Sequence, residues 1–246
     1  MSDGSRISEA AHWLSEARSV AVLTGAGISA ESGLPTFRGP GGLWRNQKPE
    51  QLATPQAFAR DPQTVWEWYD WRRQVHSDKE PNAGHRALVE LERAKNEFLL
   101  ITQNVDSLHE RAGSRAIIHL HGSLWRVRCL QCGEEQANEQ VPLDPLPPRC
   151  ACGGMQRPAV VWFGESLPER ELNTALAAAR RAEVFLVVGT SSLVYPAAAL
   201  PRVALESGAR VIEVNPEPTE LTPYAHASLR GPAGEILPQI IGVDGQ

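Results

Sequence analysis

Four cysteines lie close together in the middle of the chain and could hold one metal ion. Cys129 and Cys132 form a C-x-x-C pair, and Cys150 and Cys152 form a C-x-C pair further along. Four thiolates satisfy the tetrahedral preference of zinc and leave no ligand position open, which is typical of a structural site. We therefore predict one structural zinc. The C-x-C spacing is tighter than usual, and four free buried thiols are the alternative.

A glycine-rich segment, TGAGISAESGLPTFRG, begins at Thr24 directly after an apolar run. Glycines at such a turn let the backbone approach a ligand, and amides followed by a helix N-terminus favour a pyrophosphate. The spacing, Gly25-x-Gly27 and then Gly33, is not the G-x-G-x-x-G of ordinary dehydrogenases, and no acidic residue closes the next strand. A purely structural turn is the alternative to a nucleotide site.

The stretch VWEWYDWRRQ, residues 65–74, carries aromatic rings beside two arginines. If PQTVWEWYDWRRQVHS is a helix, Tyr69 and Arg72 are three positions apart and share a face. A phenol hydroxyl and a guanidinium fork could together bind a carboxylate. The alternative is an aromatic helix face that packs in the core with a solvated edge.

The elements that must position these groups follow an alternating pattern. Apolar runs that end in Gly, Ser or Asn occur at 20–27, 98–104, 182–192 and 210–216, and such runs are typical of strands buried on both faces. Helical patterns at 83–94 and 168–182 lie between them. The sequence predicts an α/β fold with a doubly wound, Rossmann-like parallel sheet, in which ligands bind at the carboxyl ends of the strands.

Two stretches interrupt this pattern and predict a smaller inserted domain. Residues 36–80 are rich in Trp, Pro and Gln, and residues 122–160 hold the cysteines. We expect these two to form one smaller domain, with the predicted zinc site in the second stretch. Residues 1–35, 81–121 and 161–246 then form the discontinuous domain that carries the parallel sheet.

The charge balance argues against nucleic acid as a partner. The chain has 24 basic and 29 acidic residues, a net charge of −5, and no Lys/Arg-rich tract. The first twenty residues show no apolar signal core, and no membrane-length apolar run occurs. We expect a cytoplasmic protein with no membrane partner, in a compartment that keeps the clustered cysteines reduced.

Several separate motifs, in order along residues 20–240, resemble one family. They are GAGISAESGLPTFRG, TQNVD, LHGS, VVWFGE, GTSS, EVN and the cysteine cluster. Together they resemble the sirtuins, NAD-dependent protein lysine deacylases. The resemblance implies that the sheet domain is an NAD-binding domain and that the smaller domain consists of a helical module and a zinc ribbon. It also implies NAD as a consumed co-substrate, and free lysine, nicotinamide and an O-acyl-ADP-ribose as products.

The resemblance also implies roles for individual residues. His121 would be the general base that activates a ribose hydroxyl, and Asn104 and Asp106 would act beside it around the ribose and nicotinamide. His119 would point to the opposite face if both histidines lie on one strand. We expect the other histidines to be structural or solvated: His12, His76, His85, His109 and His226.

By the same resemblance, two sets of binding residues are expected. The NAD contacts would be Gly25, Ala26, Gly27, Ser29, Ala30, Glu31, Phe37, Arg38, Trp44, Gln103, Asn104, Val105, Asp106, Gly189, Thr190, Ser191, Asn215, Glu217 and Ala233. The substrate contacts would be Ala53, Tyr69, Arg72, Val161, Phe163, Gly164, Glu165, Val194 and Tyr195. An acyl-lysine protein would lie between the domains as an added strand.

The most specific prediction concerns which acyl group the protein removes. The Y-x-x-R pattern, with Ala53 of QLATP and Thr36, resembles the class III branch, which removes succinyl and malonyl groups. An arginine inside the acyl pocket would favour acidic acyl chains and add little for an acetyl group. The alternatives are a plain deacetylase, a mono-ADP-ribosyltransferase, or a module that binds NAD or ADP-ribose without turnover.

Overall fold

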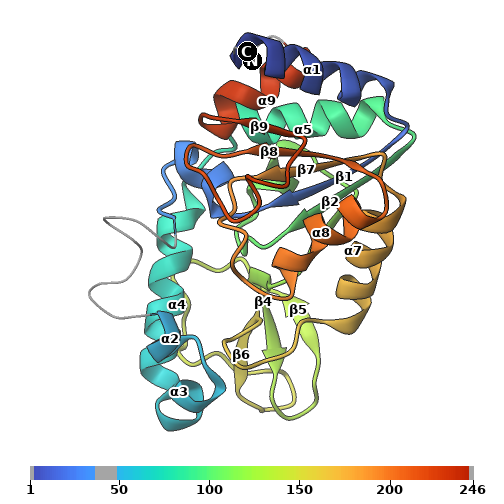
Figure 1. Cartoon of the computed structure of the whole chain (residues 1–246). Coiled ribbons are helices and arrows are strands. Elements are labelled where there is room, and N and C mark those ends of the chain that lie inside the picture. The colour runs from blue at the N-terminus through green and yellow to red at the C-terminus, as the bar shows by residue number, and fades with distance from the viewer. Residues whose placement is uncertain (1–2, 37–48, 244–246) are drawn as a thin grey trace.

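The computed structural model of the chain describes residues 3–36 and 49–243. A parallel sheet with helices on both faces occupies one end, and a smaller module built around the long helix α4 occupies the other (Figure 1). No helix in these two ranges is long and apolar enough to span a lipid bilayer.

The large sheet has six parallel strands in the order β3-β2-β1-β7-β8-β9. Its strands are β1 (Ser19–Thr24), β2 (Glu97–Thr102), β3 (Ile117–His119), β7 (Val184–Val188), β8 (Arg210–Val214) and β9 (Ala227–Leu229). Thr24, the last residue of β1, is in register with Thr102 and Val188. The strands therefore end at one edge, and the predicted doubly wound α/β fold is confirmed.

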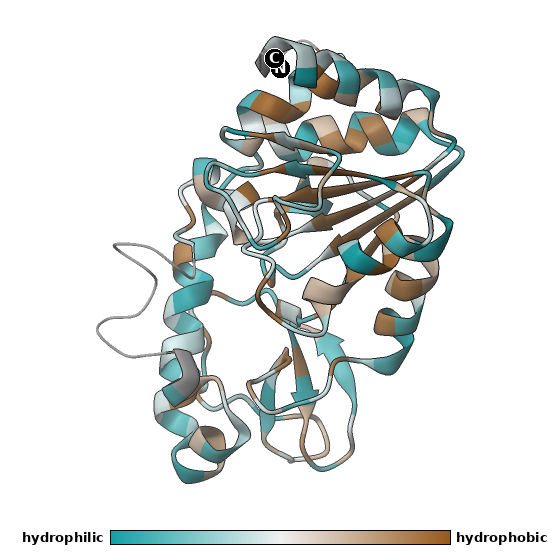
Figure 2. Cartoon of the chain, viewed as in Figure 1, coloured by the Kyte–Doolittle hydropathy of each residue, from teal (hydrophilic) through white to brown (hydrophobic). Residues whose placement is uncertain are grey.

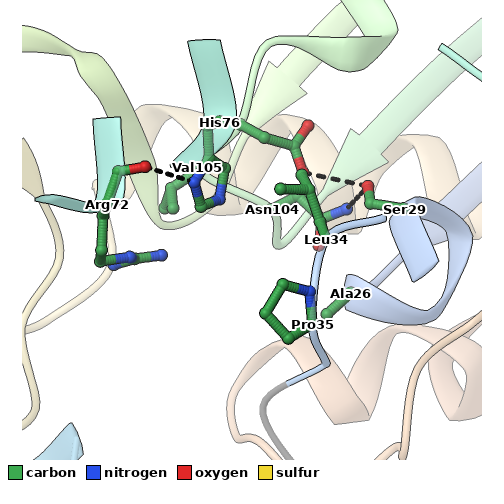
Figure 3. Close-up of a pocket in the computed structure, with 9 residues that line it drawn as sticks. Ala26, Ser29, Leu34, Pro35, Arg72, His76, Asn104 and Val105 are labelled. Carbon is green, nitrogen blue, oxygen red and sulfur yellow. Dashed lines mark hydrogen bonds between the residues drawn. The ribbon is translucent and has the colours of Figure 1, made fainter. Parts of the chain in front are cut away.

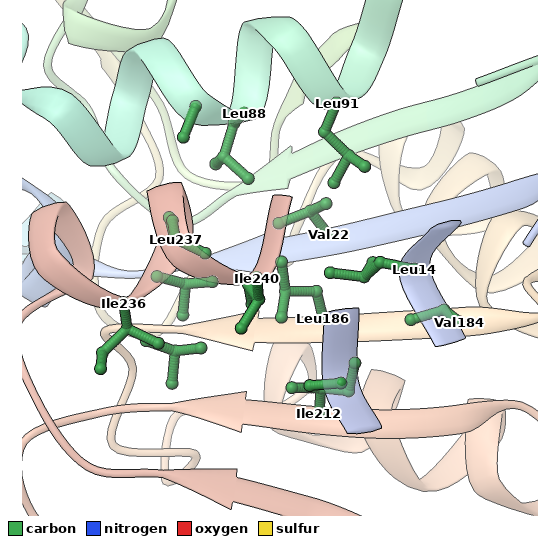
Figure 4. Packing of buried hydrophobic residues seen from close by; sticks show 14 of the residues in the cluster. Leu14, Val22, Leu88, Leu91, Val184, Leu186, Ile212, Ile236, Leu237 and Ile240 are labelled. Atoms are coloured by element: carbon green, nitrogen blue, oxygen red, sulfur yellow. The ribbon is translucent and has the colours of Figure 1, made fainter. Parts of the chain in front are cut away.

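Helices cover both faces of this sheet. On one face lie α1 (Asp3–Glu16), α5 (Ala83–Ala94) and α9 (Ala233–Ile241), and on the other lie α7 (Glu169–Arg181) and α8 (Leu200–Glu206). Figure 4 shows Leu88, Leu237 and Ile240 of the first group packed on Val22 and Leu186 of the strands. The strands are the most hydrophobic part of the fold (Figure 2), because both of their faces are buried.

The smaller module combines three helices with a three-stranded antiparallel sheet. The helices are α2 (Pro49–Leu52), α3 (Pro55–Arg60) and α4 (Pro62–Ser77), and the strands are β4 (Gly122–Cys129), β5 (Glu135–Ala137) and β6 (Gln156–Val160). They share a separate core that includes Phe58, Trp66 and Trp162. The short elements that remain are α6 (Leu108–Ala112) and the 3-10 helices η1 (Ala26–Ser32) and η2 (Ala197–Ala199).

Helix α4 has local signals at its start and distant partners along its length. Asp61 caps it by accepting from the Thr64 amide, and Pro62 stands in the first turn. Trp66 donates its indole N–H to the Gln156 carbonyl at 2.9 Å, and Arg73 donates from Nε to the Leu124 carbonyl at 2.8 Å. These buried bonds fix the rotation of α4 against the small sheet.

Two short strands and one turn depart from the sequence expectations. The strands β3 and β9 have three residues each, too few to give a clear apolar run. A helix follows the glycine turn as predicted, but it is a 3-10 helix: η1 has Gly25 as its N-cap and Gly33, with φ 81°, as its C-cap. The division of the chain into two domains stays a prediction.

Candidate active site

The glycines after β1 face the loop after β7 at the carboxyl edge of the sheet. Gly25 donates its amide to the Val188 carbonyl, and Gly27 donates to the Gly189 carbonyl at 2.8 Å. A Cβ on Gly27 would lie 2.6 Å from the Gly189 Cα. Glycine is therefore required here for the contact between two loops, in addition to any approach of a ligand.

Three buried polar side chains, those of Ser29, Asn104 and Asp106, lie together at this edge of the sheet. Ser29 donates to Asp106 Oδ2 at 3.0 Å, and Asn104 Nδ2 donates to the Gly25 carbonyl at 3.2 Å and lies 3.3 Å from Ser29 Oγ. The Leu108 amide donates to Asp106 Oδ1. Burial raises the pKa of Asp106. A polar ligand group at this position would meet both an amide and a carboxyl group.

A pocket opens between this edge and α4 (Figure 3). Its lining residues are Ala26, Ser29, Leu34, Pro35, Arg72, His76, Asn104, Val105 and Asp106. Seven of them come from the segments around Ala26 and Asn104, and two come from α4. The predicted NAD residues and the predicted acyl residue Arg72 thus meet in one pocket, with apolar walls that suit a flat ring and polar groups that suit an amide or an acid.

His121 follows the short strand β3 and faces the same edge. Its Nδ1 lies 2.9 Å from the Gln103 carbonyl oxygen. Because a carbonyl can only accept, Nδ1 carries the hydrogen, and Nε2 of the neutral ring has a lone pair. Burial lowers the pKa of His121, so the ring is neutral near pH 7. A neutral imidazole with a free Nε2 is equipped to remove a proton.

His119 differs from His121 although it is only two residues away. Its Nε2 lies 2.6 Å from Glu110 Oε1 and its Nδ1 lies 3.4 Å from the Asn104 carbonyl. Burial opposes protonation, but the Glu110 carboxylate raises the pKa of His119 overall. His119 is an ion-pairing residue, and only His121 has the free nitrogen of a base.

The loop after β7 carries three further predicted NAD residues. Gln103 Nε2 donates to Thr190 Oγ1 at 3.0 Å, which ties the β2 loop to the β7 loop. Gly189 has φ 60°, and Ser191 is half-buried. Asn215 follows β8 and donates its side-chain amide to the Glu217 carbonyl at 2.7 Å. These positions extend the pocket edge towards β8.

Two of the predicted NAD residues around α9, Glu31 and Ala233, have structural roles in the fold. Glu31 accepts from the Gly234 amide at 2.6 Å and so caps the start of α9. Ala233 is buried in the core against α5, and its side chain faces protein. Ala30 is exposed on η1. Any contact of Ala233 with a ligand would have to involve its backbone.

The predicted peptide segment lies between His121 and Ala53. The Val161 amide donates to the His121 carbonyl and the Phe163 amide to the Ala53 carbonyl, both at 2.9 Å. Residues 161–165 do not form a strand themselves, since β6 ends at Val160. Phe163, Gly164, Val194 and Tyr195 are exposed, as an open peptide site requires.

Glu165 is the predicted substrate residue whose carboxylate is already occupied. Both of its oxygens accept from Arg157, at 2.6 and 2.9 Å, and the Trp162 amide donates to Oε2 at 2.8 Å. These contacts shape the turn from residue 161 to 165. Glu165 therefore supports this turn, and its contact with a substrate stays a prediction.

Tyr69 and Arg72 both point into the protein, which spacing alone could not establish. Tyr69 is 2% exposed and Arg72 is 4% exposed. The guanidinium carbon lies 4.9 Å from the Trp68 ring centre and 5.7 Å from the Tyr69 ring centre. Burial raises the pKa of Tyr69 to about 12, so the phenol is a neutral donor. Arg72 lines the pocket directly, and the Tyr69 ring, which is not part of that lining, lies beside the Arg72 guanidinium.

The four cysteines form a compact cluster at the end of the small sheet. Cys129 Sγ lies 3.5 Å from Cys152 Sγ, Cys132 Sγ lies 3.7 Å from Cys150 Sγ, and all four lie within 4.8 Å of one another. Sulfurs around a tetrahedral zinc with bonds of about 2.3 Å are about 3.8 Å apart. The C-x-C pair therefore brings both sulfurs to the cluster despite its short spacing, and the donor set fits a structural zinc.

Comparison with known proteins identifies the family. A Sir2 family profile matches residues 25–196. The chain belongs to the Sir2 family.

Other Sir2 proteins agree over nearly the whole chain. NAD-dependent protein deacylase 2 of Pyrobaculum aerophilum is 55% identical over 229 residues, which cover 93% of this chain and 92% of that protein. A solved Sir2 homologue in complex with NAD superposes with a TM-score of 0.91 at 50% identity, covering 96% of this chain and 92% of that one. The structure of Sir2Af2 bound to a myristoylated histone peptide superposes with a TM-score of 0.78 at 38% identity, covering 97% and 96%.

Three residues of this Sir2 chain were not anticipated as part of the site. His76 was expected to be structural or solvated, but its ring lines the pocket between Arg72 and Asn104 (Figure 3), and its Nδ1 donates to the Arg72 carbonyl. Ser192 has φ 56°, a left-handed conformation that is uncommon outside glycine and asparagine. No spacing in the sequence distinguishes either residue.

Glu213 on β8 is the third residue that was not anticipated. It is 1% exposed and accepts from the hydroxyl groups of Thr219, Thr222 and Ser228. Arg230 lies 3.4 Å away. These bonds hold the loop that carries Asn215 and Glu217. A carboxylate inside an otherwise apolar strand is the signal that could have revealed it.

Phe37, Arg38 and Trp44, which are predicted to contact NAD, lie outside the described residues. Thr36 is the last described residue before that gap and is half-buried.

Proposed function

We infer that this Sir2-family chain is an NAD-dependent protein deacylase, and we propose that it prefers lysines that carry succinyl or malonyl groups. The first part follows the family and the names of relatives such as the deacylase 2 of Pyrobaculum aerophilum. The second part rests on one observation: a guanidinium, that of Arg72, is almost fully buried at the wall of the pocket.

In the proposed reaction, the sheet edge would hold NAD through the turn at Gly25, the Asn104 to Asp106 segment and the β7 loop at Gly189. NAD, when bound, supplies a ribose carbon that becomes electrophilic as its nicotinamide departs. Asn104 and Asp106 would orient the ring amide and the ribose, because both side chains are buried and held by Ser29 and by backbone groups.

His121 would act as the base for a ribose hydroxyl. Its Nδ1 is committed to the Gln103 carbonyl, which fixes the ring orientation, and Nε2 can take the proton. The acyl-lysine peptide would lie along the 161–163 segment on one side and Val194 and Tyr195 on the other. Since the Val161 and Phe163 amides already donate within the protein, strand-like pairing with the peptide would use carbonyl groups of this segment.

The acyl preference follows from the cost of burying charge. A carboxylate moved into a dry pocket loses its hydration, and a fixed guanidinium compensates this loss. An acetyl group gains nothing from the same cation. Arg72 is held against Trp68 and Tyr69, so the cation is positioned before a substrate arrives. The preference is therefore for acyl chains that end in a carboxylate.

The test is kcat/KM with NAD for one peptide bearing acetyl-, malonyl-, succinyl- or myristoyl-lysine. We expect succinyl and malonyl to exceed acetyl in the wild type, and Arg72→Met to reduce the succinyl-to-acetyl ratio by about a hundredfold, as for loss of a buried charge pair. The matched control is Arg73→Met, which removes the neighbouring arginine that binds the Leu124 carbonyl and faces away from the pocket. It should lower stability and leave the ratio unchanged.

Other outcomes identify the competing functions. A preference for myristoyl would indicate an apolar acyl site in place of a carboxylate site; the solved Sir2Af2 has a myristoylated histone peptide bound. Release of nicotinamide without acyl transfer would indicate a mono-ADP-ribosyltransferase. A protein that binds NAD and releases no nicotinamide would be a sensor.

A further inference from the structure

The hydroxyl oxygen of Tyr69 accepts a hydrogen bond from a tryptophan. Trp162 donates its indole N–H to the Tyr69 oxygen at 2.9 Å. Tyr69 is 2% exposed and Trp162 is 3% exposed, so water does not compete for this bond. Tyr69 belongs to α4, and Trp162 belongs to the turn that follows β6. The bond therefore connects the predicted acyl-binding helix to the predicted peptide-binding segment.

The direction of this bond determines what the phenol can do next. A hydroxyl has one hydrogen to donate, and an indole N–H can only donate. Trp162 therefore occupies a lone pair of the Tyr69 oxygen and leaves its hydrogen available. Arg72, which also lies beside this oxygen, can only donate as well, and within residues 3–36 and 49–243 the Tyr69 hydroxyl donates no hydrogen bond. A buried donor of this kind is costly unless a ligand supplies the acceptor.

Trp162 is itself fixed by charged and aromatic neighbours. The Arg157 guanidinium carbon lies 3.4 Å from the centre of the Trp162 ring, and Glu165 accepts from both Arg157 and the Trp162 amide. The Phe58 ring lies 5.1 Å away. The indole has little freedom to rotate, so its N–H is presented to Tyr69 in one direction.

We propose that Trp162 is a positioning residue for acyl selectivity: its indole N–H orients the Tyr69 hydroxyl so that the hydroxyl hydrogen points to a substrate carboxylate beside Arg72. This inference rests on the proposed preference for carboxylated acyl groups. Trp162 does not touch the acyl chain, and it acts only through Tyr69. An acetyl substrate, which has no carboxylate, gains nothing from this orientation.

The experiment compares succinyl and acetyl peptides, with NAD in excess, for the wild type, Trp162→Phe and Tyr69→Phe. Trp162→Phe keeps an aromatic ring and removes the N–H. We expect its succinyl-to-acetyl ratio of kcat/KM to fall about tenfold, the effect of one hydrogen bond to a charged group. Tyr69→Phe should give a similar fall.

The decisive readout is the double variant. If Trp162 acts through Tyr69, adding Trp162→Phe to Tyr69→Phe changes the ratio no further. The matched control is Trp66→Phe, which also removes a buried indole N–H from α4, one that binds the Gln156 carbonyl. Its melting temperature should fall, and its acyl ratio should equal that of the wild type.

Three results would overturn the proposal. Trp162→Phe could keep the wild-type ratio, or reduce succinyl and acetyl activity equally, or lower the ratio just as much when Tyr69 is already Phe. If the wild type itself prefers acetyl, the proposed acyl preference fails and this inference fails with it. Should Trp162→Phe not fold, benzothienylalanine at position 162 replaces the N–H by sulfur with almost the same shape, and the same ratio decides.

Discussion

The candidate site has two sides, the sheet wall and the α4 wall, and they are built in different ways. The sheet wall consists of Gly25–Ser29, Gln103–Asp106 and Gly189–Ser192, where strand ends bring short loops together through backbone contacts such as Gly27 to Gly189. The α4 wall consists of Tyr69, Arg72 and the turn at residues 161–165, and long side chains connect its parts.

From this difference we infer which property of the enzyme each wall controls. The sheet wall holds the groups that every acyl substrate would need, among them His121 and Asp106, on a backbone that cannot shift without disturbing neighbouring strands. The α4 wall presents the Arg72 cation with the Tyr69 hydroxyl beside it, and a single side-chain change can alter either without moving a strand. Changes in the sheet wall should therefore reduce all activity, and changes in the α4 wall should alter the preference among acyl groups.

The largest expected effect is that of His121→Ala. Loss of the base should reduce kcat/KM by about 10² to 10⁴ for succinyl and acetyl peptides alike, because general base catalysis typically contributes this much. Steady-state kinetics with both peptides measures it, and NAD binding should be retained. His119→Gln is the control, since His119 pairs with Glu110, and it should keep most of the activity. Full activity of His121→Ala would remove this residue from the mechanism.

Gly27→Ala should have the next largest effect. The added Cβ would meet the Gly189 Cα at 2.6 Å, so one loop must move. A displacement of about 1 Å can cost about a hundredfold in rate, and we expect kcat/KM for NAD to fall by this amount with either peptide. Gly4→Ala, which meets nothing within 4 Å, is the control. A change confined to the succinyl peptide would contradict the division between the walls.

Gly154→Ala tests whether the cysteine cluster only supports the α4 wall. The new Cβ would lie 2.8 Å from Cys129 Sγ and 2.7 Å from the Gln131 Cβ. Overpacking of this kind costs about 1–3 kcal/mol, so the melting temperature and the zinc content by metal analysis should both fall. The succinyl-to-acetyl ratio of the folded fraction should stay constant. An altered ratio would mean that the cluster reaches the pocket.

The smallest effect is on the pH dependence. Burial lowers the pKa of His121 below its ordinary value of 6.5. The base must be neutral, so activity is present above the lowered pKa and is lost as the pH falls through it. The acid limb of kcat/KM should therefore lie below pH 6.5. His119→Gln should leave that limb in place, and its disappearance in this variant would reassign the titrating group.

Much of the sheet wall could be predicted from the sequence because its signals are local. Apolar runs end at Thr24, Thr102 and Val188, and parallel strands in register bring the residues that follow to one edge. The cysteine spacings likewise predicted a cluster that the fold assembles. Two features could not be read from the sequence: Glu165 pairs with Arg157, and the helix after the glycine turn is of the 3-10 type.

The sequence by itself determined the strand ends, the four-cysteine set and the shared helix face of Tyr69 and Arg72, since each depends on residues near in the chain. Only the tertiary structure decided that Arg72 faces the pocket while Arg73, one position on, binds the Leu124 carbonyl. Adjacent residues on a helix point about 100° apart, as 3.6 residues per turn require. Which of them meets the site depends on how α4 is rotated, and contacts with residues far along the chain set that rotation.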